Sequence, residues 1–476
     1  MTKIRTRFAP SPTGFLHIGG LRTALFNYLF AKQNNGEFIL RIEDTDQQRL
    51  VEGAAEALLE TLDQLGLKPD GKVEHQSQRL NFYKKAADKL LKKNLAYPCF
   101  CSSERLDKLR QEQQANKQVP KYDGHCRHLS KEEVEQRLKS VGDKHVIRFK
   151  IPEDKIVEAE DIVYGKISVK SADLDDFVLI KTDNYPTYHL ANIVDDYTMG
   201  ISHVIRGEEW LPSFPKHVLL YQALGYPMPQ FVHLPLLLNP DKSKLSKRQG
   251  DVAVEDFLAK GYLPEALINY VTLLGWNPGN DQELFLINQL IEQFSLEKIN
   301  KAGAVFDVNK LNWFNAEYIR RIIAEAGERY QQLIKQAQMY LKKHEDRAED
   351  ILKLFGSRIN HLSEISDLGN FLFELPKYSS DMLVFKKSDQ QKTNQGLSLS
   401  LGSLAKINTD DWQLKKLNQT LEDIAGKHGL TPGDIFWPVR VALSGQEKSP
   451  SPSEILETLG KEESLNRIKL AINKLK

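Results

Sequence analysis

The stretch Pro10-Ser-Pro-Thr-Gly-Phe-Leu-His-Ile-Gly-Gly20 separates two segments with clear secondary-structure patterns. Residues 4–9 before it read as a short strand, and the residues after it predict an amphipathic helix. The apolar positions of that helix are Leu21, Ala24, Leu25, Tyr28 and Leu29. Gly36 marks the end of the helix, and Phe38–Ile42 is apolar enough to be a strand buried on both faces. Strand, glycine-rich loop, helix and strand form a βαβ unit, which predicts a parallel sheet.

The loop itself has features of a phosphate-binding site. Gly14, Gly19 and Gly20 allow close approach of the backbone. A loop that leads into a helix presents free N–H groups and the positive end of the helix dipole. Ser11 and His17 add side-chain donors. An ordinary turn between strand and helix can also contain glycine, but a histidine in this Pro/Gly context makes the pattern more specific.

Length and composition exclude several classes of protein. The chain has 476 residues, with 65 Lys+Arg against 64 Asp+Glu and 41% hydrophobic residues, so it is not disordered and has material for about three domains. No apolar run approaches the roughly 20 residues that a membrane span needs, and no signal peptide is apparent. We expect a soluble, cytoplasmic protein without membrane contact. The net charge of +1 gives no support for bulk attraction to nucleic acid, although a basic patch can lie within a neutral total.

A second candidate site is the basic loop Asp241-Lys-Ser-Lys-Leu-Ser-Lys-Arg248. Three lysines and an arginine within eight residues can fold over a polyphosphate and neutralise the charge that develops in its transition state. The alternative is a solvated basic loop, which a run of lysines alone usually is.

Together these segments resemble a known family. His17-Ile-Gly-Gly20 and Lys244-Leu-Ser-Lys-Arg248 are similar to the two signatures of class I aminoacyl-tRNA synthetases. The whole chain resembles the bacterial glutamyl-tRNA synthetases. The segments that carry this resemblance are Arg7-Phe-Ala-Pro-Ser-Pro-Thr-Gly14, Arg41-Ile-Glu-Asp-Thr-Asp46, Tyr188-His-Leu-Ala-Asn192, Arg206-Gly-Glu-Glu-Trp210 and Trp437-Pro-Val-Arg-Val-Ala-Leu-Ser-Gly445. Two positions depart from the general class I signatures, Gly20 in place of His and Arg248 in place of Ser, and both variants are usual in the glutamyl branch.

The resemblance assigns roles residue by residue. The catalytic residues that it implies are His17, Lys244 and Lys247. The implied glutamate-binding residues are Arg7, Ala9, Ser11, Glu43, Tyr188, Asn192 and Arg206. The implied ATP-binding residues are Pro10, Thr13, Gly14, His17, Gly19, Gly20, Lys244, Leu245, Ser246, Lys247 and Arg248. The chemistry agrees, because Arg7 and Arg206 can pair carboxylates bidentately and Glu43 can take the ammonium group.

The reaction that the resemblance implies has two steps. Glutamate attacks the α-phosphorus of ATP to give an adenylate and pyrophosphate, and the 3′ end of the glutamate tRNA then takes the acyl group. Mg²⁺ is expected with the ATP phosphates. The implied partners are tRNA, L-glutamate and ATP, and we expect a monomer.

The chain's three cysteines form a candidate zinc site. Cys99, Cys101 and Cys126 lie close together in sequence with His128, and three cysteines with one histidine are a ligand set of closed, structural zinc sites. We therefore expect one structural Zn²⁺ per chain. His125 is an alternative fourth ligand, Tyr122 a weaker one, and three incidental thiols the remaining interpretation.

The expected fold is α/β, a Rossmann-like doubly wound parallel sheet split by an insertion and followed by an all-helical C-terminal anticodon-binding region. We expect residues 1–98 and 176–250 to be the two halves of the catalytic domain. Residues 99–175 would be an inserted domain that binds the tRNA acceptor end and carries the zinc module. Residues 251–325 would be a helical stem-contact domain, and residues 326–476 the helical anticodon-binding domain. Almost no strand is predicted after residue 251.

Three alternatives remain open from the sequence. A glutaminyl-tRNA synthetase shares the signatures but should carry β-barrel anticodon domains, and residues after 320 have a helical pattern. A paralogue that glutamylates a tRNA base should resemble the family only in the catalytic core. A non-catalytic, zinc-containing RNA-binding protein would not need His17, Lys244 and Lys247. Whether tRNA for glutamine is also charged does not follow from the sequence.

Overall fold

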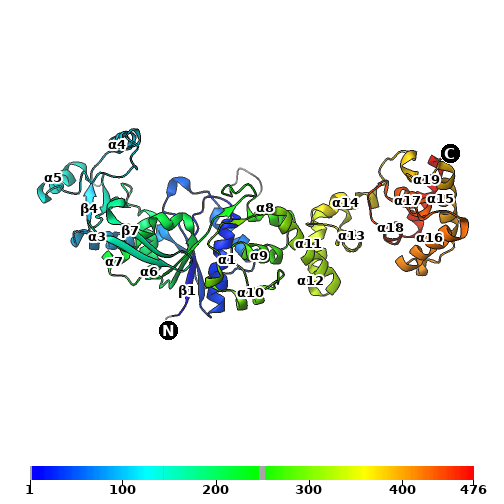
Figure 1. Ribbon diagram of the computed structural model, residues 1–476, viewed down its shortest axis with the longest axis horizontal. Helices are drawn as coiled ribbons and strands as arrows, with labels where there is room; N and C mark the ends of the chain where they lie inside the picture. Colours follow the sequence, from blue (N-terminus) through cyan, green and yellow to red (C-terminus); the bar gives the residue numbers. More distant parts are fainter. Residues whose placement is uncertain (1–2, 143, 246–251) are drawn as a thin grey trace. The chain divides into compact units, whose positions relative to one another are not determined.

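The computed structural model describes residues 3–142, 144–245 and 252–476. The chain divides into two compact units (Figure 1). The N-terminal unit comprises residues 1–258 and 264–308, and the C-terminal unit comprises residues 259–263 and 309–476. No helix in the described ranges is long and apolar enough to cross a membrane.

The N-terminal unit begins with the βαβ unit that the sequence predicts. Strand β1 (Arg5–Phe8) leads through the glycine-rich loop into α1 (Ile18–Gln33), and β2 (Glu37–Ile42) follows. β1 and β2 are parallel, and β3 (Glu74–His75) pairs with the other edge of β2. Of the predicted apolar positions of α1, Leu21, Ala24, Leu25 and Leu29 are fully buried and Tyr28 is half-buried.

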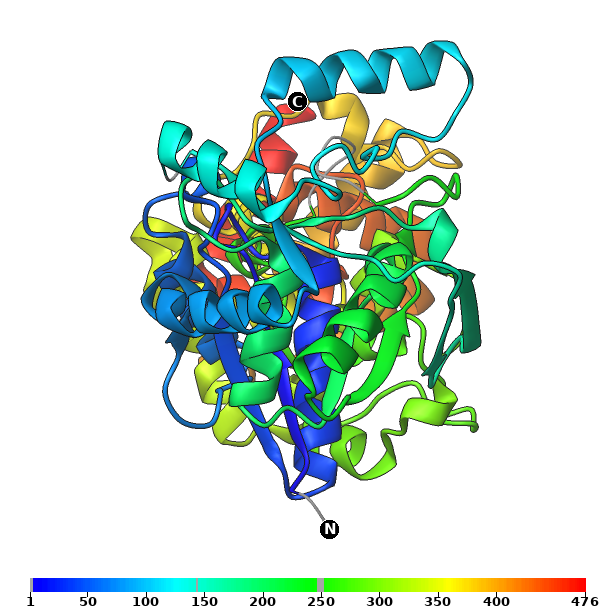
Figure 2. The same ribbon diagram turned by 90° about the vertical axis from the view of Figure 1, so that its left-hand side faces the viewer.

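A second sheet, which lies beside the first, comes from a distant part of the chain. Its elements are α6 (Tyr188–Thr198), β9 (His203–Gly207), α7 (Phe214–Leu224) and β10 (Gln230–Leu234). β9 and β10 are parallel. β9 lies beside β1 (Figure 2), and the backbone N–H of Ser202 donates to the carbonyl of Arg5 at 3.0 Å. The carboxyl ends of β1 and β9 therefore lie close together.

Between these halves lies a segment of mixed structure. Its elements are β4 (Ala96–Cys99), α4 (Ser103–Ala115), α5 (Lys131–Val141), β5 (Val146–Phe149), β6 (Ile156–Asp161), β7 (Gly165–Lys170) and β8 (Val178–Ile180). β4, β5 and β8 form a small antiparallel sheet, and α4 and α5 project beyond it (Figure 1). The hairpin β6–β7 instead extends the sheet of β9 and β10, because Asp161 of β6 pairs with Phe231 of β10.

The rest of the N-terminal unit is mainly helical but contains a strand pair. Its elements include β11 (Leu237–Leu238), α8 (Val254–Ala259), α9 (Pro264–Leu273), α10 (Ile287–Gln293) and β12 (Ala304–Val305). β12 pairs in parallel with β11, in a region where the sequence predicts almost no strand. A two-residue strand is too short to produce an alternating pattern of apolar and polar residues, so the sequence pattern does not predict β12.

The described part of the C-terminal unit is helical throughout, as expected. Its α-helices are α11 (Val308–Glu325), α12 (Glu328–Leu341), α13 (Ala348–Phe355), α14 (Glu364–Phe373), α15 (Gln390–Ala405), α16 (Leu414–His428), α17 (Pro432–Ser444), α18 (Pro452–Leu459) and α19 (Lys461–Lys474). A buried cation, Arg467 of α19, links three of them. Its guanidinium donates to the carbonyls of Phe371, Leu372 and Leu443, which belong to the last turns of α14 and α17.

We expect Arg467→Met to destabilise the C-terminal unit. Three helix-terminal carbonyls would lose their donor while remaining buried, so the free energy of unfolding should fall by about 2–4 kcal/mol. Thermal unfolding followed by circular dichroism measures this change. Lys469→Met on the same helix is the matched control, because Lys469 is exposed and should change stability by less than about 0.5 kcal/mol. Equal melting temperatures for the two variants would contradict the prediction.

Candidate active site

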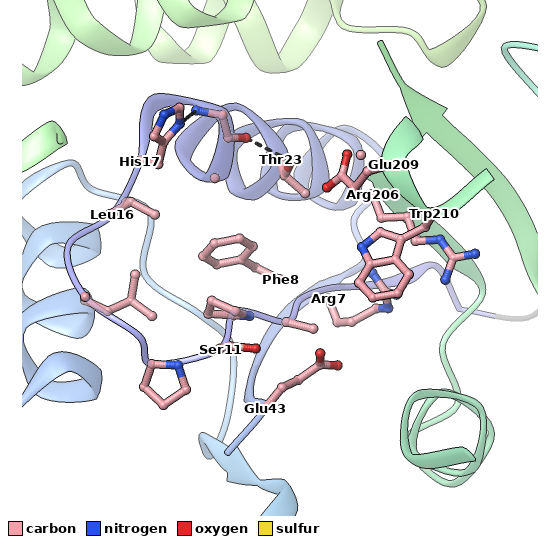
Figure 3. A pocket seen from close by; sticks show the side chains of 18 of the residues that line it. Arg7, Phe8, Ser11, Leu16, His17, Thr23, Glu43, Arg206, Glu209 and Trp210 are labelled. Atoms are coloured by element: carbon pink, nitrogen blue, oxygen red, sulfur yellow. Dashed lines mark hydrogen bonds between the residues drawn. The ribbon is translucent and has the colours of Figure 1, made fainter. Parts of the chain in front are cut away.

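A cavity of about 320 Å³ lies at the carboxyl ends of β1 and β9. Ligands of parallel α/β sheets bind at this edge. The expected site residues in its wall are Arg7, Ala9, Pro10, Ser11, Gly14, His17, Gly19, Gly20, Glu43, Tyr188 and Arg206. Figure 3 shows His17 toward one end of the cavity and Arg206 with Trp210 toward the other. The fold thus brings together most of the residues that the two predicted substrates would need.

Some expected residues lie elsewhere. Thr13, Asn192, Lys244 and Leu245 are described but do not line this cavity. Ser246, Lys247 and Arg248, which the sequence predicts to contact ATP, lie outside the described residues. Asn192 is buried, and its amide nitrogen has no hydrogen-bond partner among the described residues.

Other residues in the wall were not singled out from the sequence. They include Phe8, Leu16, Thr23, Glu209 and Trp210. The ring of Trp210 stacks on that of Tyr188, with 3.8 Å between ring centroids. Glu209 and Trp210 belong to the motif that begins at Arg206, so the motif itself was a signal for both.

The glycine-rich loop ends in a capped helix terminus. His17 is the N-cap of α1, and its Nδ1 accepts a hydrogen bond from the backbone N–H of Gly19 at 3.0 Å. Gly14 has a φ of 136°, which side chains rarely adopt. A Cβ atom on Gly20 would lie only 3.0 Å from the side chain of Leu16, so close packing favours glycine here. The loop therefore presents the positive end of α1 to the cavity.

The loop is also tied to the segment that follows the basic loop. The backbone N–H of Ile18 donates to the carbonyl of Val252 at 2.9 Å, and that of Val254 donates to Leu16 at 2.8 Å. On the near side of the basic loop, the N–H of Leu245 donates to Leu237 at 2.9 Å. Both described flanks of the basic loop are thus anchored within the N-terminal unit, one of them to the phosphate-binding loop.

Arg7 and Glu43 belong to a buried network of charges. The Nε of Arg7 lies 3.0 Å from Asp196, and the fully buried Arg41 bridges Asp196 at 2.7 Å and Glu43 at 3.1 Å. Burial raises the pKa of Glu43. Burial acts in the same direction on Asp196, but Arg7 and Arg41 hold its pKa below the usual value. Arg7 is therefore already paired with Asp196 in this structure.

Arg206 has a different environment. Its side chain is 5% exposed, and its three nitrogens donate to His233 Nε2 at 3.0 Å, Tyr188 Oη at 3.2 Å and His217 Nδ1 at 3.1 Å. No carboxylate forms an ion pair with Arg206 in the described ranges. A buried guanidinium without a counter-charge beside a cavity is suited to bind an anionic group.

The three cysteines also converge. Their sulfur atoms all lie within 4.8 Å of one another, and those of Cys101 and Cys126 are 3.6 Å apart. The hydroxyl of Tyr122 lies 3.4 Å from Cys99 and 3.6 Å from Cys101. His128, the expected fourth ligand, is not part of this cluster. Three convergent thiols with a nearby oxygen match the donor chemistry of a tetrahedral zinc site.

Comparisons with known proteins agree with this geometry. The model of the family described as tRNA synthetases class I (E and Q), catalytic domain, matches residues 3–313. An anticodon binding domain matches residues 304–472. Because the first match covers more than half of the chain, the protein belongs to the class I tRNA synthetases for glutamate and glutamine.

Relatives that match over the full length assign the chain to one branch of this family. The chain is 45% identical to glutamate–tRNA ligases of Clostridium novyi and Clostridium kluyveri, with 100% of this chain and 98% or 99% of those proteins covered. It is similar to the crystal structure of a glutamate tRNA ligase from Elizabethkingia meningosepticum in complex with its amino acid, with 37% identity, a TM-score of 0.87 and both chains fully covered. A glutamate-tRNA synthetase structure from Elizabethkingia anophelis gives the same TM-score at 38% identity. The chain is a member of the glutamate–tRNA ligase family, and the α/β fold with a helical anticodon-binding region is confirmed.

Proposed function

We propose that this cavity is the site where glutamate is activated with ATP and then transferred to the 3′ end of tRNA. The observation that carries the assignment to this site is Arg206, a buried cation at the cavity wall whose described partners are all neutral. The side-chain carboxylate of glutamate supplies the missing counter-charge. Glu43, also in the wall, is the anion for the substrate's ammonium group.

The nucleotide occupies the other end of the cavity. The start of α1 directs backbone N–H groups and a helix dipole toward the phosphates, and His17 contributes a ring donor. A carboxylate oxygen of glutamate forms a bond to the α-phosphorus of ATP as the bond to pyrophosphate breaks. Lys244 and Lys247 are the cations for the charge that develops on the phosphates, with Mg²⁺ bound to the phosphates themselves. These residues mainly position the reactants and stabilise charge.

The second step joins the acyl group to tRNA. A hydroxyl of the terminal adenosine attacks the carbonyl carbon of the adenylate, and AMP leaves. We propose that residues 99–175 hold the acceptor end, that residues 251–325 contact the stem and that residues 326–476 read the anticodon of tRNA for glutamate. The helical C-terminal unit and the anticodon-domain match support this arrangement over the β-barrel domains expected of a glutaminyl enzyme. The match beyond the catalytic core also argues against a base-modifying paralogue. We place the reaction in the cytoplasm and expect the chain to act as a monomer.

ATP–pyrophosphate exchange tests this function directly. The full chain with tRNA and L-glutamate should exchange labelled pyrophosphate into ATP, and it should esterify the tRNA with glutamate. Exchange with glutamine alone would favour the glutaminyl alternative. Absence of exchange with either amino acid, in a chain that still binds tRNA, would favour the non-catalytic RNA-binding alternative.

We also propose that Cys99, Cys101 and Cys126 hold one structural Zn²⁺ per chain. The metal would order a part of the chain that has little apolar surface of its own, since the hydrophobic cluster here is built around the cysteines and Tyr97 with Tyr122. The position of the Tyr122 hydroxyl supports this side chain as the fourth ligand in place of His128.

We expect Cys126→Ser to lose zinc and to loosen residues 99–128, because two thiols and a phenol cannot replace the closed ligand set. Elemental analysis of protein purified without chelator measures the metal. Among the fourth-ligand candidates, Tyr122→Phe should weaken zinc retention against a competing chelator, and the matched His128→Asn should not. Wild-type protein with no metal and three freely titratable thiols would show that the cysteines are incidental.

A further inference from the structure

Arg206 is held by a set of neutral acceptors, two of which are buried histidines. Nε of the guanidinium donates to His233, one terminal nitrogen donates to His217, and the other donates to the hydroxyl of Tyr188. His217 and His233 are both 0% exposed. Both imidazoles therefore contact Arg206 away from solvent, from β10 and α7.

His233 is fixed by a carboxylate behind it. Its Nδ1 lies 2.7 Å from Asp161 Oδ2, and Asp161 also accepts the backbone N–H groups of His233, Val163 and Tyr164. The ring nitrogen next to a carboxylate carries the proton, so Nε2 has its lone pair directed at Arg206. The negative charge of Asp161 is thereby kept one imidazole away from the guanidinium.

His217 lies against a second imidazole. Because a guanidinium can only donate, Nδ1 of His217 is the acceptor for Arg206, and its Nε2 donates to Nδ1 of His189 at 3.0 Å. Burial and the charge of Arg206 lower the pKa of His217, and burial lowers those of His233 and His189, the last to about 4. All three rings are accordingly neutral near pH 7.

This arrangement fixes the orientation of the Arg206 guanidinium and leaves its positive charge uncompensated. A guanidinium has five N–H donors, and the three contacts to described residues use one donor on each nitrogen. The two remaining donors lie on the two terminal nitrogens, which is the geometry that a carboxylate accepts bidentately. A direct carboxylate partner would orient Arg206 equally well, but it would cancel the charge.

We propose that His217 and His233 are positioning residues that orient Arg206 without neutralising it, and that they thereby set the preference for a carboxylate over an amide in the substrate side chain. This inference rests on the proposed glutamate site. It extends that site by two imidazoles that do not line the cavity and act only through Arg206.

The test is a pair of variants that differ in charge and hardly in shape. The Oδ1 atom of Asn or Asp lies near the position of Nδ1 in histidine, so His217→Asn keeps a neutral acceptor and His217→Asp places a carboxylate beside Arg206. Glutamate, glutamine and ATP dependence are measured by pyrophosphate exchange with tRNA. We expect His217→Asn to change the KM for glutamate by less than about tenfold, and His217→Asp to raise it roughly 100-fold or more. The KM for ATP should stay unchanged in both, and the preference for glutamate over glutamine should fall only in the Asp variant.

Equal values of the glutamate KM in the two variants would overturn the proposal, because a purely structural histidine makes no distinction between them. A parallel rise in the KM for ATP would also overturn it. If the Asp variant does not fold, His233→Gln and His233→Glu give the same comparison at the Nε2 position, with the same expected order. The substitution Arg206→Gln separates this inference from the proposed function. If Arg206→Gln leaves glutamate kinetics unchanged, the glutamate site itself is misplaced. If Arg206→Gln has a large effect but His217→Asn and His217→Asp have the same KM for glutamate, the glutamate site stands and only the role of the histidines is removed.

Discussion

Arg206→Gln should lower kcat/KM for glutamate by roughly 10²–10⁴-fold, since a substrate carboxylate would then be desolvated without a partner. The loss should appear mainly in the KM for glutamate, with the KM for ATP nearly unchanged, because the proposed nucleotide site is at the other end of the cavity. The glutamine amide carries no charge, so activity with glutamine should fall much less. Pyrophosphate exchange at varied amino-acid concentration measures all three quantities.

Two further substitutions make this result specific. Arg206→Lys keeps the charge but loses the planar fork, and an intermediate effect is expected. Arg5→Gln removes a cation that pairs with Glu37 on the same sheet but outside the cavity, and glutamate kinetics should be close to wild type. Unchanged glutamate kinetics in Arg206→Gln would remove this residue from the substrate site.

The second large effect is expected at His17. This residue combines two tasks, because its Nδ1 caps α1 through Gly19 and the remaining ring nitrogen is the proposed donor to the phosphates. His17→Ala removes both, whereas His17→Asn restores a good N-cap without the distant donor. Adenylate formation should fall by roughly 10²–10³-fold in both variants.

Stability should separate the two variants. The alanine variant should lose about 1 kcal/mol of stability with its cap, and the asparagine variant should melt close to wild type. Rapid single-turnover measurement of adenylate formation, together with thermal unfolding, gives both quantities. Recovery of activity along with stability in His17→Asn would show that the histidine acts only as a cap.

The sequence was most informative where a short local pattern determines the structure. The glycine-rich loop before residue 21 predicted the βαβ unit, because a strand, a turn and an amphipathic helix are encoded by neighbouring residues. The motif from Arg206 to Trp210 and the position of Glu43 pointed to side chains that do line one cavity. Resemblance to the family, more than periodicity, brought these separate motifs together.

Pairings between distant segments could not be found in this way. Asp196 neutralises Arg7 across an α-helix and a strand that are far apart in sequence, and nothing near Arg7 indicates such a partner. From the sequence, Tyr122 was only a weaker candidate ligand, because its contact with the cysteines depends on how a loop without regular structure folds back. Residues 156–170 lie within the expected insertion, but the hairpin that they form pairs with β10, and no local pattern indicates this pairing.

The buried charge network has a consequence for synthesis on the ribosome. Arg41 lies in the first βαβ unit, but its partner Asp196 follows 155 residues later. A nascent chain that ends before this point would have to bury Arg41 with Glu43 but without Asp195 and Asp196, which is less favourable. We therefore expect the first strands and α1 to reach their final packing more readily once α6 has left the exit tunnel. Electrostatics thus couples the folding of the first βαβ unit to the completion of α6.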